Sequence, residues 1–224
     1  MYFKLKKPIL YAWLLLPFYF TAAQNLFHEI EFGKKIPSQN SNYILDINWK
    51  KEYNNDWNRI GLNFTFINSL KNNWTISSGL DNYYVMDTKA INYFEARPWI
   101  MISLKSKVLE KLYFTQFFKA EWRNFFYSSE NEYDQYNRLR YRFHFDYLLF
   151  DKTNKIFLKP GIEWYILKKS ATNERYANSK EYYVRCSIES NEKEWNIGVK
   201  REVFFTTIIP NEEKVISFFV EYKF

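Results

Sequence analysis

The chain has 224 residues, of which 22% are aromatic and 25% are charged, and its formal net charge is +7. Disordered chains are poor in aromatic residues, so this composition excludes extended disorder for most of the length. The mean hydropathy is nevertheless -0.48, so the aromatic and charged side chains must be sorted onto separate surfaces. Basic residues form no block of like charge, and no nucleic-acid partner is therefore expected.

Residues 1–23 have the pattern of a cleavable signal peptide. A lysine-rich start precedes the apolar stretch Ile9–Phe20, and small residues suit cleavage after Ala23. The apolar stretch is about 12 residues long, against the ~20 that a membrane-spanning helix needs, and no later apolar run reaches that length. We therefore expect an exported protein. Residues 24–42 that follow are interpreted as a periplasmic segment, a plug or an extra strand.

From residue 43 to residue 224 the sequence alternates between apolar and polar residues over segments of about ten residues. The clearest segment is 138–149, where Leu139 and Tyr141 share one face and Arg138 and Arg140 share the other. This region predicts an all-β fold, an antiparallel up-and-down transmembrane β-barrel of about ten strands, with twelve if 24–42 hides a hairpin. The expected strands are 43–53, 57–67, 74–84, 92–104, 112–124, 138–149, 156–167, 181–190, 195–205 and 215–224.

The connections between these segments alternate in length. Short polar turns are expected at 68–73, 105–111, 151–155 and 191–194, and longer loops at 85–91, 125–136, 168–180 and 206–214. Short periplasmic turns, longer outer loops and an even strand count are typical of outer-membrane barrels. An even count places both ends of the barrel on the periplasmic side.

The same alternation fits a soluble periplasmic barrel or sandwich with its apolar face inside. Aromatic residues at consecutive positions on one face of a strand, such as Phe143 and Phe145, are too bulky for the interior of a small closed sheet. Five tryptophans lie near expected strand ends, where interfacial girdles occur: Trp57, Trp74, Trp122, Trp164 and Trp195. These features favour an outer-membrane barrel of a Gram-negative bacterium, in contact with outer-membrane lipid.

The last expected strand carries apolar and aromatic residues on one face. These residues resemble the C-terminal signal that the barrel-insertion machinery recognises: Phe218, Val220, Tyr222 and Phe224. The machinery is therefore an expected partner during biogenesis.

The opposite face of the strands is expected to line the lumen. Its basic residues form a track: Arg97, Arg123, Arg138, Arg140 and Arg142. Its acidic partners are Glu95, Glu121, Asp146 and Glu163. Because an unpaired, desolvated charge costs several kcal/mol, we expect these charges to pair and fill a narrow barrel. The alternative is an open lumen whose arginines favour small anionic solutes.

Two stretches, 94–99 (Phe-Glu-Ala-Arg-Pro-Trp) and 138–143 (Arg-Leu-Arg-Tyr-Arg-Phe), add a resemblance. Together with the signal peptide and the aromatic strands, they make the chain similar to the bacteroidete family called domain of unknown function number 2490. The resemblance spans most of residues 42–224. It implies an outer-membrane barrel without an established activity, and it carries over no catalytic residue.

Little in the sequence indicates catalysis. The chain has two histidines, His28 and His144, and His144 has no nearby serine on its face. The lone Cys186 cannot form an internal disulfide, and no spacing typical of metal ligands or of a phosphate loop occurs. We therefore predict no enzyme, no metal and no cofactor. The leading hypothesis is a narrow, charge-filled barrel that acts through its structure or outer loops; the alternatives are a porin-like channel for small anions and an envelope-lipid enzyme.

Overall fold

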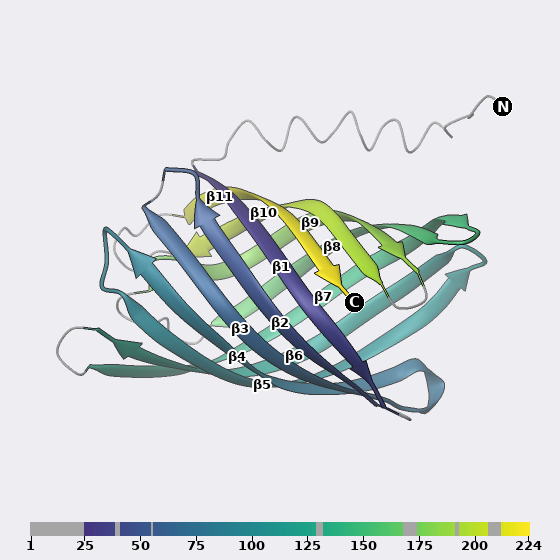
Figure 1. The fold of residues 1–224 in the computed structure, drawn as a ribbon, viewed down its shortest axis with the longest axis horizontal. Coiled ribbons are helices and arrows are strands. Elements are labelled where there is room, and N and C mark those ends of the chain that lie inside the picture. Colours follow the sequence, from purple (N-terminus) through teal and green to yellow (C-terminus); the bar gives the residue numbers. More distant parts are fainter. Residues whose placement is uncertain are drawn as a thin grey trace.

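Alternating apolar and polar residues form strands throughout the computed structural model, which describes residues 25–38, 41–54, 56–128, 132–167, 174–190, 193–205 and 212–224. These described residues form eleven strands in one closed barrel (Figure 1). The strands are β1 (Asn25–Pro37), β2 (Ser41–Glu52), β3 (Trp57–Ser69), β4 (Trp74–Asp87), β5 (Tyr93–Leu109), β6 (Leu112–Tyr127), β7 (Tyr133–Asp151), β8 (Lys155–Leu167), β9 (Ala177–Glu189), β10 (Glu194–Phe205) and β11 (Glu212–Lys223). A short 3-10 helix, η1 (Lys71–Asn73), precedes β4.

The predicted all-β barrel is confirmed, with a strand count between the expected ten and twelve. Strands that follow one another in the sequence pair antiparallel, as expected. The closing pair differs, because β1 and β11 run parallel from Asn25 opposite Val215 to Gly33 opposite Lys223. At the end of this pair, the Phe224 N–H donates to the Gly33 carbonyl at 3.0 Å.

The additional strand, β1, lies within residues 24–42. Its two edges pair with β2 and β11, so neither is left open. An odd number of strands places the start of β1 and the end of β11 at opposite ends of the barrel, so the expectation that both ends share one side is wrong. The predicted signal peptide, 1–23, lies outside the described residues and stays a prediction.

The two ends of the barrel differ in the lengths of their connections. Strands β3, β5 and β7 are followed by short segments, 70–73, 110–111 and 152–154. Strand β8 is followed by the longest segment, 168–176. The end of the barrel with segments 70–73, 110–111 and 152–154 is called the short-turn end. The opposite end, with segment 168–176, is called the long-loop end. The described part of the chain contains no helix long and apolar enough to cross a membrane.

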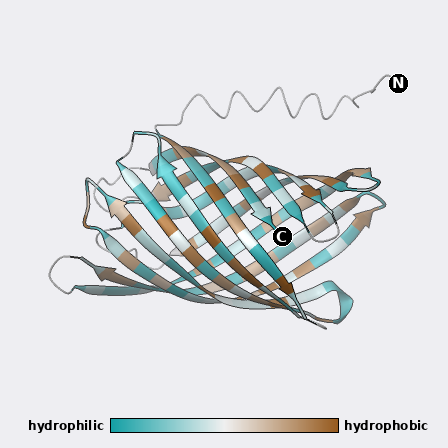
Figure 2. Cartoon of the chain, viewed as in Figure 1, coloured by the Kyte–Doolittle hydropathy of each residue, from teal (hydrophilic) through white to brown (hydrophobic). Residues whose placement is uncertain are grey.

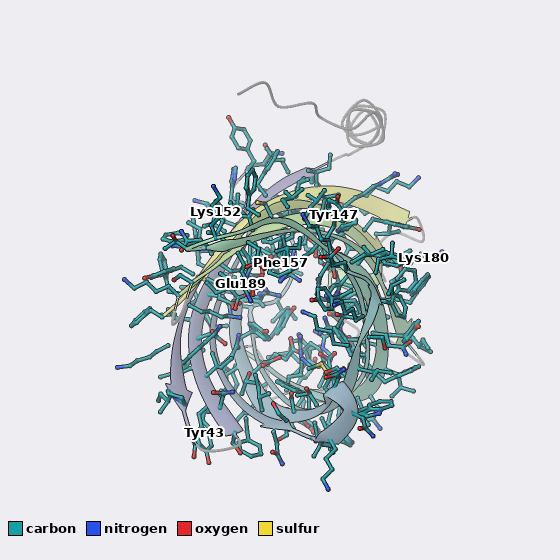
Figure 3. All side chains as sticks on the ribbon, turned by 90° about the vertical axis from the view of Figure 1, so that its right-hand side faces the viewer. Tyr43, Tyr147, Lys152, Phe157, Lys180 and Glu189 are labelled. Carbon is teal, nitrogen blue, oxygen red and sulfur yellow. The ribbon has the colours of Figure 1, made fainter. Side chains whose placement is uncertain are left out.

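Hydrophilic and hydrophobic residues alternate along the strands (Figure 2), and the two kinds face opposite sides of the sheet. Leu139 and Ile166 point outward and keep 55% and 59% of their surface exposed, whereas Glu163 points inward and is 0% exposed. Seen along the barrel, side chains project both into the ring of strands and away from it (Figure 3). Apolar residues therefore cover the outside, the arrangement opposite to that of a soluble barrel.

Glycine occurs on the inward face where an aromatic ring leans over the sheet. The Trp99 indole on β5 covers its neighbour Gly79 on β4, and a Cβ at Gly79 would lie 2.5 Å from the ring and 2.4 Å from the Phe64 carbonyl oxygen. The Trp99 Nε1 donates to Asp81 at 2.8 Å, which fixes the ring in this position. Only glycine leaves room for such an approach.

Replacing Gly79 by Ala should therefore destabilise the barrel by about 1–3 kcal/mol, because the ring and the backbone must move apart. Urea unfolding of the folded barrel in lipid measures the loss. The matched control is Ser78→Ala, since Ser78 is the next residue on β4 and points outward. Equal stability of the two variants would contradict the expected crowding.

Candidate functional site: a charged lumen with an aromatic plug

Three arginines on β7 line one wall of the lumen, because residues two apart on a strand share a face. Glu121 on β6 and Glu163 on β8 neutralise them. The Arg138 Nε lies 2.6 Å from Glu121, and the Arg140 Nη1 lies 2.7 Å from the same carboxylate. The Arg142 Nε donates to Glu163 at 2.8 Å, and the Arg140 Nε contacts Glu163 at 2.5 Å. Two carboxylates thus hold three guanidinium groups.

The other two residues of the predicted basic track join the same wall through Glu95 on β5. The Arg97 Nε donates to Glu95 at 2.8 Å, and the Arg123 Nη2 donates to Glu95 at 2.9 Å. Asp146 lies elsewhere, towards the short-turn end, where it pairs with Lys105 at 3.1 Å and His144 at 3.2 Å. The structure therefore brings all five predicted arginines together with three of the four predicted acidic partners.

The opposite wall combines lysine with glutamate. Lys50 on β2 pairs with Glu202 on β10 at 2.6 Å, and Lys200 on β10 pairs with Glu29 on β1 at 2.6 Å. Glu29 is a lumen residue that the sequence analysis missed, because its segment was not placed in the barrel. These pairs link strands on both sides of the β1–β11 closure.

Aromatic rings lie between the charged groups. The Tyr83 ring has the Arg59 guanidinium 4.4 Å from its centroid and the Arg97 guanidinium 4.7 Å away. The Tyr165 ring lies in the same way beside Arg138 and Arg140, at 4.9 and 4.8 Å. Such cation–π contacts are favourable, and more so where the cation is desolvated. They hold the guanidinium groups against the walls of the lumen.

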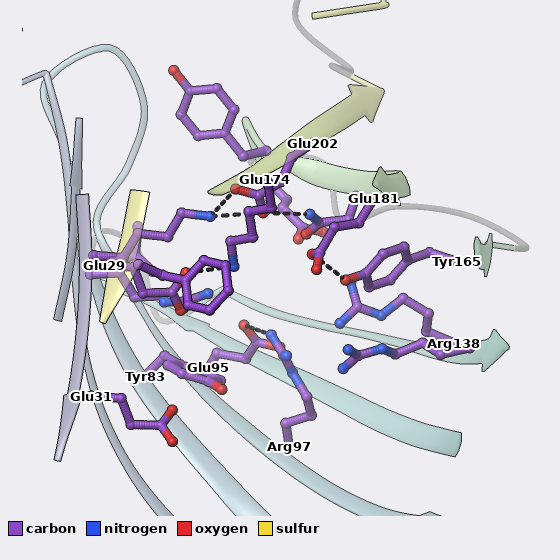
Figure 4. Close-up of a pocket in the computed structure, with 18 of the residues that line it drawn as sticks. Glu29, Glu31, Tyr83, Glu95, Arg97, Arg138, Tyr165, Glu174, Glu181 and Glu202 are labelled. Atoms are coloured by element: carbon purple, nitrogen blue, oxygen red, sulfur yellow. Dashed lines mark hydrogen bonds and ion pairs between the residues drawn. The ribbon is translucent and has the colours of Figure 1, made fainter. Parts of the chain in front are cut away.

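A cavity of about 230 Å³ remains between the two walls (Figure 4). Nine basic and seven acidic side chains line it, and the carboxylates of Glu121 and Glu163, which are not part of the lining, pair with three of the lining arginines. Towards the short-turn end the paired side chains are more accessible, with Lys105 47% and Lys35 35% exposed. We infer that water reaches the cavity from that end.

An apolar cluster lies inside the barrel at the long-loop end. It consists of nine inward side chains from the ends of eight strands and one from the β8–β9 connection, and none exceeds 8% exposure. We call this cluster the aromatic plug: Phe27, Trp57, Val85, Tyr93, Phe125, Tyr127, Tyr136, Tyr176, Phe204 and Val215. Its rings contact one another, with 5.4 Å between the centroids of Phe27 and Trp57 and 5.4 Å between those of Tyr93 and Phe125.

A three-residue segment before β9, Glu174–Tyr176, is folded into this mouth, and we call it the strap. Glu174 is buried and pairs with the Arg123 Nη1 at 2.6 Å, which fixes the strap to β6. Arg175 lies 3.4 Å from Asp87 on β4. The Tyr176 ring packs 5.3 Å from Phe27 on β1. The strap therefore crosses the mouth and is held from several sides.

No model of a known protein family matches the sequence, and no curated protein matches it. Among solved structures, the chain is similar to a NanC porin in a rhombohedral crystal form, with a TM-score of 0.45 and 12% sequence identity. The similarity covers 75% of this chain and 78% of that one. It concerns the fold alone, and the resemblance of residues 94–99 and 138–143 to a family stays a prediction.

Four of the five tryptophans assigned to a girdle point outward. Trp74, Trp122 and Trp195 are exposed, and Trp164 is partly exposed. The assignment of Trp57 is wrong, because this residue is buried in the aromatic plug. Trp57 lies two positions before the lumen residue Arg59 on β3, so the two side chains share a face. This parity is the sequence signal that indicates an inward Trp57.

The apolar face of β11 is outward, as the alternation predicts. Tyr222 stacks on Trp195 of β10 with 4.3 Å between ring centroids, and Phe218 and Phe224 are exposed. Val220 lies between them on the same face, opposite Ile30 of β1. Recognition of these residues by the insertion machinery stays a prediction.

The residues considered for catalysis lie apart from one another. His144 faces the lumen beside Asp146, while His28 points outward from β1 opposite Lys51. Cys186 is free on β9. Among the described residues, no group of three His, Cys, Asp or Glu side chains is placed to hold a metal ion.

Proposed function

We propose that this chain is an integral outer-membrane barrel whose lumen is closed, and that it acts through its outer surface and long loops. The apolar exterior and the inward placement of the acidic strand residues support insertion into a bilayer, since lipid-facing charge is unfavourable in transmembrane barrels. The paired arginines support a filled lumen, because each is held by a carboxylate and is not free to attract a solute.

The aromatic plug is the observation that carries the closed lumen. A wide porin keeps a water-filled channel, whereas here Phe27, Trp57 and Tyr176 meet inside the barrel mouth. The strap adds a buried ion pair between Glu174 and Arg123. Opening the mouth would expose that pair and the apolar cluster together.

Refolded protein in lipid tests both parts of the proposal. We expect the folded barrel to migrate differently on a gel before and after boiling, because closed barrels resist detergent. Identical migration would contradict a membrane barrel. In planar bilayers, we expect no current steps from the wild-type chain, and regular steps would contradict a closed lumen.

A channel for small anions is the second candidate, and the arginines that line the cavity favour it. In that case the wild-type chain should conduct with an anion preference. Arg140→Glu should then remove or reverse the preference, because Arg140 lines the cavity. Conduction without any change of preference in this variant would count against the arginine track.

A further inference from the structure

The outward face of the barrel carries charge of one sign. Among the outward strand positions whose side chains the structure describes, every charged residue is basic: Lys34, Lys51, Lys180, Arg201 and Lys214. The acidic strand residues whose side chains are described, such as Glu163 and Glu202, face the lumen side. If contact with lipid merely excluded charged residues, it would exclude acidic and basic residues alike. The presence of basic residues alone on the outward face therefore needs a separate explanation.

The basic residues are also gathered on one side and at one end. Lys180, Arg201 and Lys214 lie on the adjacent strands β9, β10 and β11, near the long-loop end. Lys51 continues the group on β2, across β1, whereas the outward positions described for β3–β8 carry no charge. Lys180 is seen projecting away from the ring of strands in Figure 3.

The pairing of the strands places three of these side chains around Val203. Val203 is opposite Lys180 on one side and opposite Lys214 on the other, and Arg201 lies two residues along on the same strand. Adjacent strands are about 4.8 Å apart, so the two lysines are roughly 10 Å apart across Val203, with Arg201 about 7 Å along the strand. Among the residues whose side chains the structure describes, none forms an ion pair with Lys180, Arg201 or Lys214.

We propose that Lys180, Arg201 and Lys214 bind the phosphate of an anionic lipid in the leaflet at the long-loop end. Cations near the edge of the lipid face cost little, unlike cations at the bilayer midplane, and basic pockets on membrane proteins bind phosphate head groups. The proposal rests on insertion into a membrane, which is part of the proposed function, but it does not depend on whether the lumen is closed.

The neighbouring outward residues fit the rest of a lipid molecule. Tyr182 lies opposite Arg201 on β9 and is exposed, as expected of an aromatic residue at the level of the head groups. Ile197 and Phe218, further towards the short-turn end, are exposed and apolar. Apolar residues directly below the basic group favour a lipid, whose chains need them, over an acidic protein.

The test uses the full chain in nanodiscs of phosphatidylcholine with a minor fraction of phosphatidylglycerol. Native mass spectrometry after release of the protein counts the bound phosphatidylglycerol, which should be enriched over its share of the nanodisc lipid. Since each basic residue near a membrane surface contributes about fivefold to anion affinity, the triple variant K180Q/R201Q/K214Q should lose roughly hundredfold. K34Q, which removes an outward lysine at the short-turn end of β1, should keep the enrichment.

An unchanged enrichment in the triple variant, or an equal loss in K34Q, would overturn the proposal. Inorganic phosphate added to the protein in detergent should displace the lipid weakly, and displacement at equal concentration would mean that the site recognises free phosphate instead of lipid. Quenching of outward tryptophans such as Trp74 by brominated lipid reports insertion separately. Normal quenching without lipid enrichment rejects this inference alone, whereas absent quenching rejects the proposed function.

Discussion

Replacing Glu121 by Ala should destabilise the barrel by about 3–5 kcal/mol, the range for removing one partner of a buried ion pair. The Glu121 side chain is 0% exposed and contacts Arg138, Arg140 and Lys119, the last at 3.2 Å. Its removal leaves the Arg138 guanidinium without a carboxylate partner among the described residues, while Arg140 keeps Glu163. The loss is therefore expected to come mainly from one uncompensated buried cation.

Urea unfolding in lipid at fixed pH measures this loss. Glu121→Gln keeps the shape and the acceptor oxygen and should cost less than Glu121→Ala. The control is Lys89→Ala, which removes a solvent-exposed partner of Asp56 in the loops. The hydrogen bond from Lys89 lowers the pKa of the Asp56 carboxyl, but solvent screens this pair, and no measurable change in stability is expected. If Glu121→Ala proved as stable as Lys89→Ala, the ion-pair network would be solvated instead of buried.

The sequence predicted the ten later strands to within a few residues, because their faces are chemically distinct. Segment 138–147 keeps every arginine on one parity and every large apolar residue on the other. That parity is enough to place Arg138, Arg140 and Arg142 in the lumen. It does not reveal which carboxylate each arginine meets, because that depends on the stagger between β6, β7 and β8.

The first strand remained one of three alternatives for residues 24–42 because its two faces are mixed. Phe27 is apolar but points inward, where it joins the aromatic plug, and His28 and Lys34 are polar but point outward. These exceptions break the period of two that identified the other strands. The strap was also beyond prediction, because Glu174 and Tyr176 lie in a connection whose contacts are with distant strands.

The aromatic plug leads to a prediction about ion conduction, which the stability of the ion pairs does not test. Replacing Trp57 and Tyr176 together by Ala should convert a silent barrel into one that gives current steps in a planar bilayer. The centroids of these two rings lie 5.5 Å apart, and both rings contact Phe27. Removing them therefore leaves Phe27 without its two aromatic neighbours in the plug. The cavity borders both rings and lies between the charged walls.

Two further variants separate opening from unfolding. Each large aromatic lost from a packed cluster costs about 3–5 kcal/mol, so the double variant must first show heat-modifiable mobility on a gel. Glu174→Gln keeps every ring of the plug but removes the charge that pairs with Arg123, and it should give brief openings if the strap holds the mouth shut. Trp74→Ala, which removes an outward tryptophan, should stay silent.

The ion selectivity of the opened variant then tests the lumen itself. Because the arginines line the cavity while their partners Glu121 and Glu163 lie outside its lining, the current should show a modest anion preference. A folded double variant that stays silent would mean that the paired arginines, and not the plug, block the lumen. In that case opening would require removal of the Arg140 side chain, which reaches between Glu121 and Glu163.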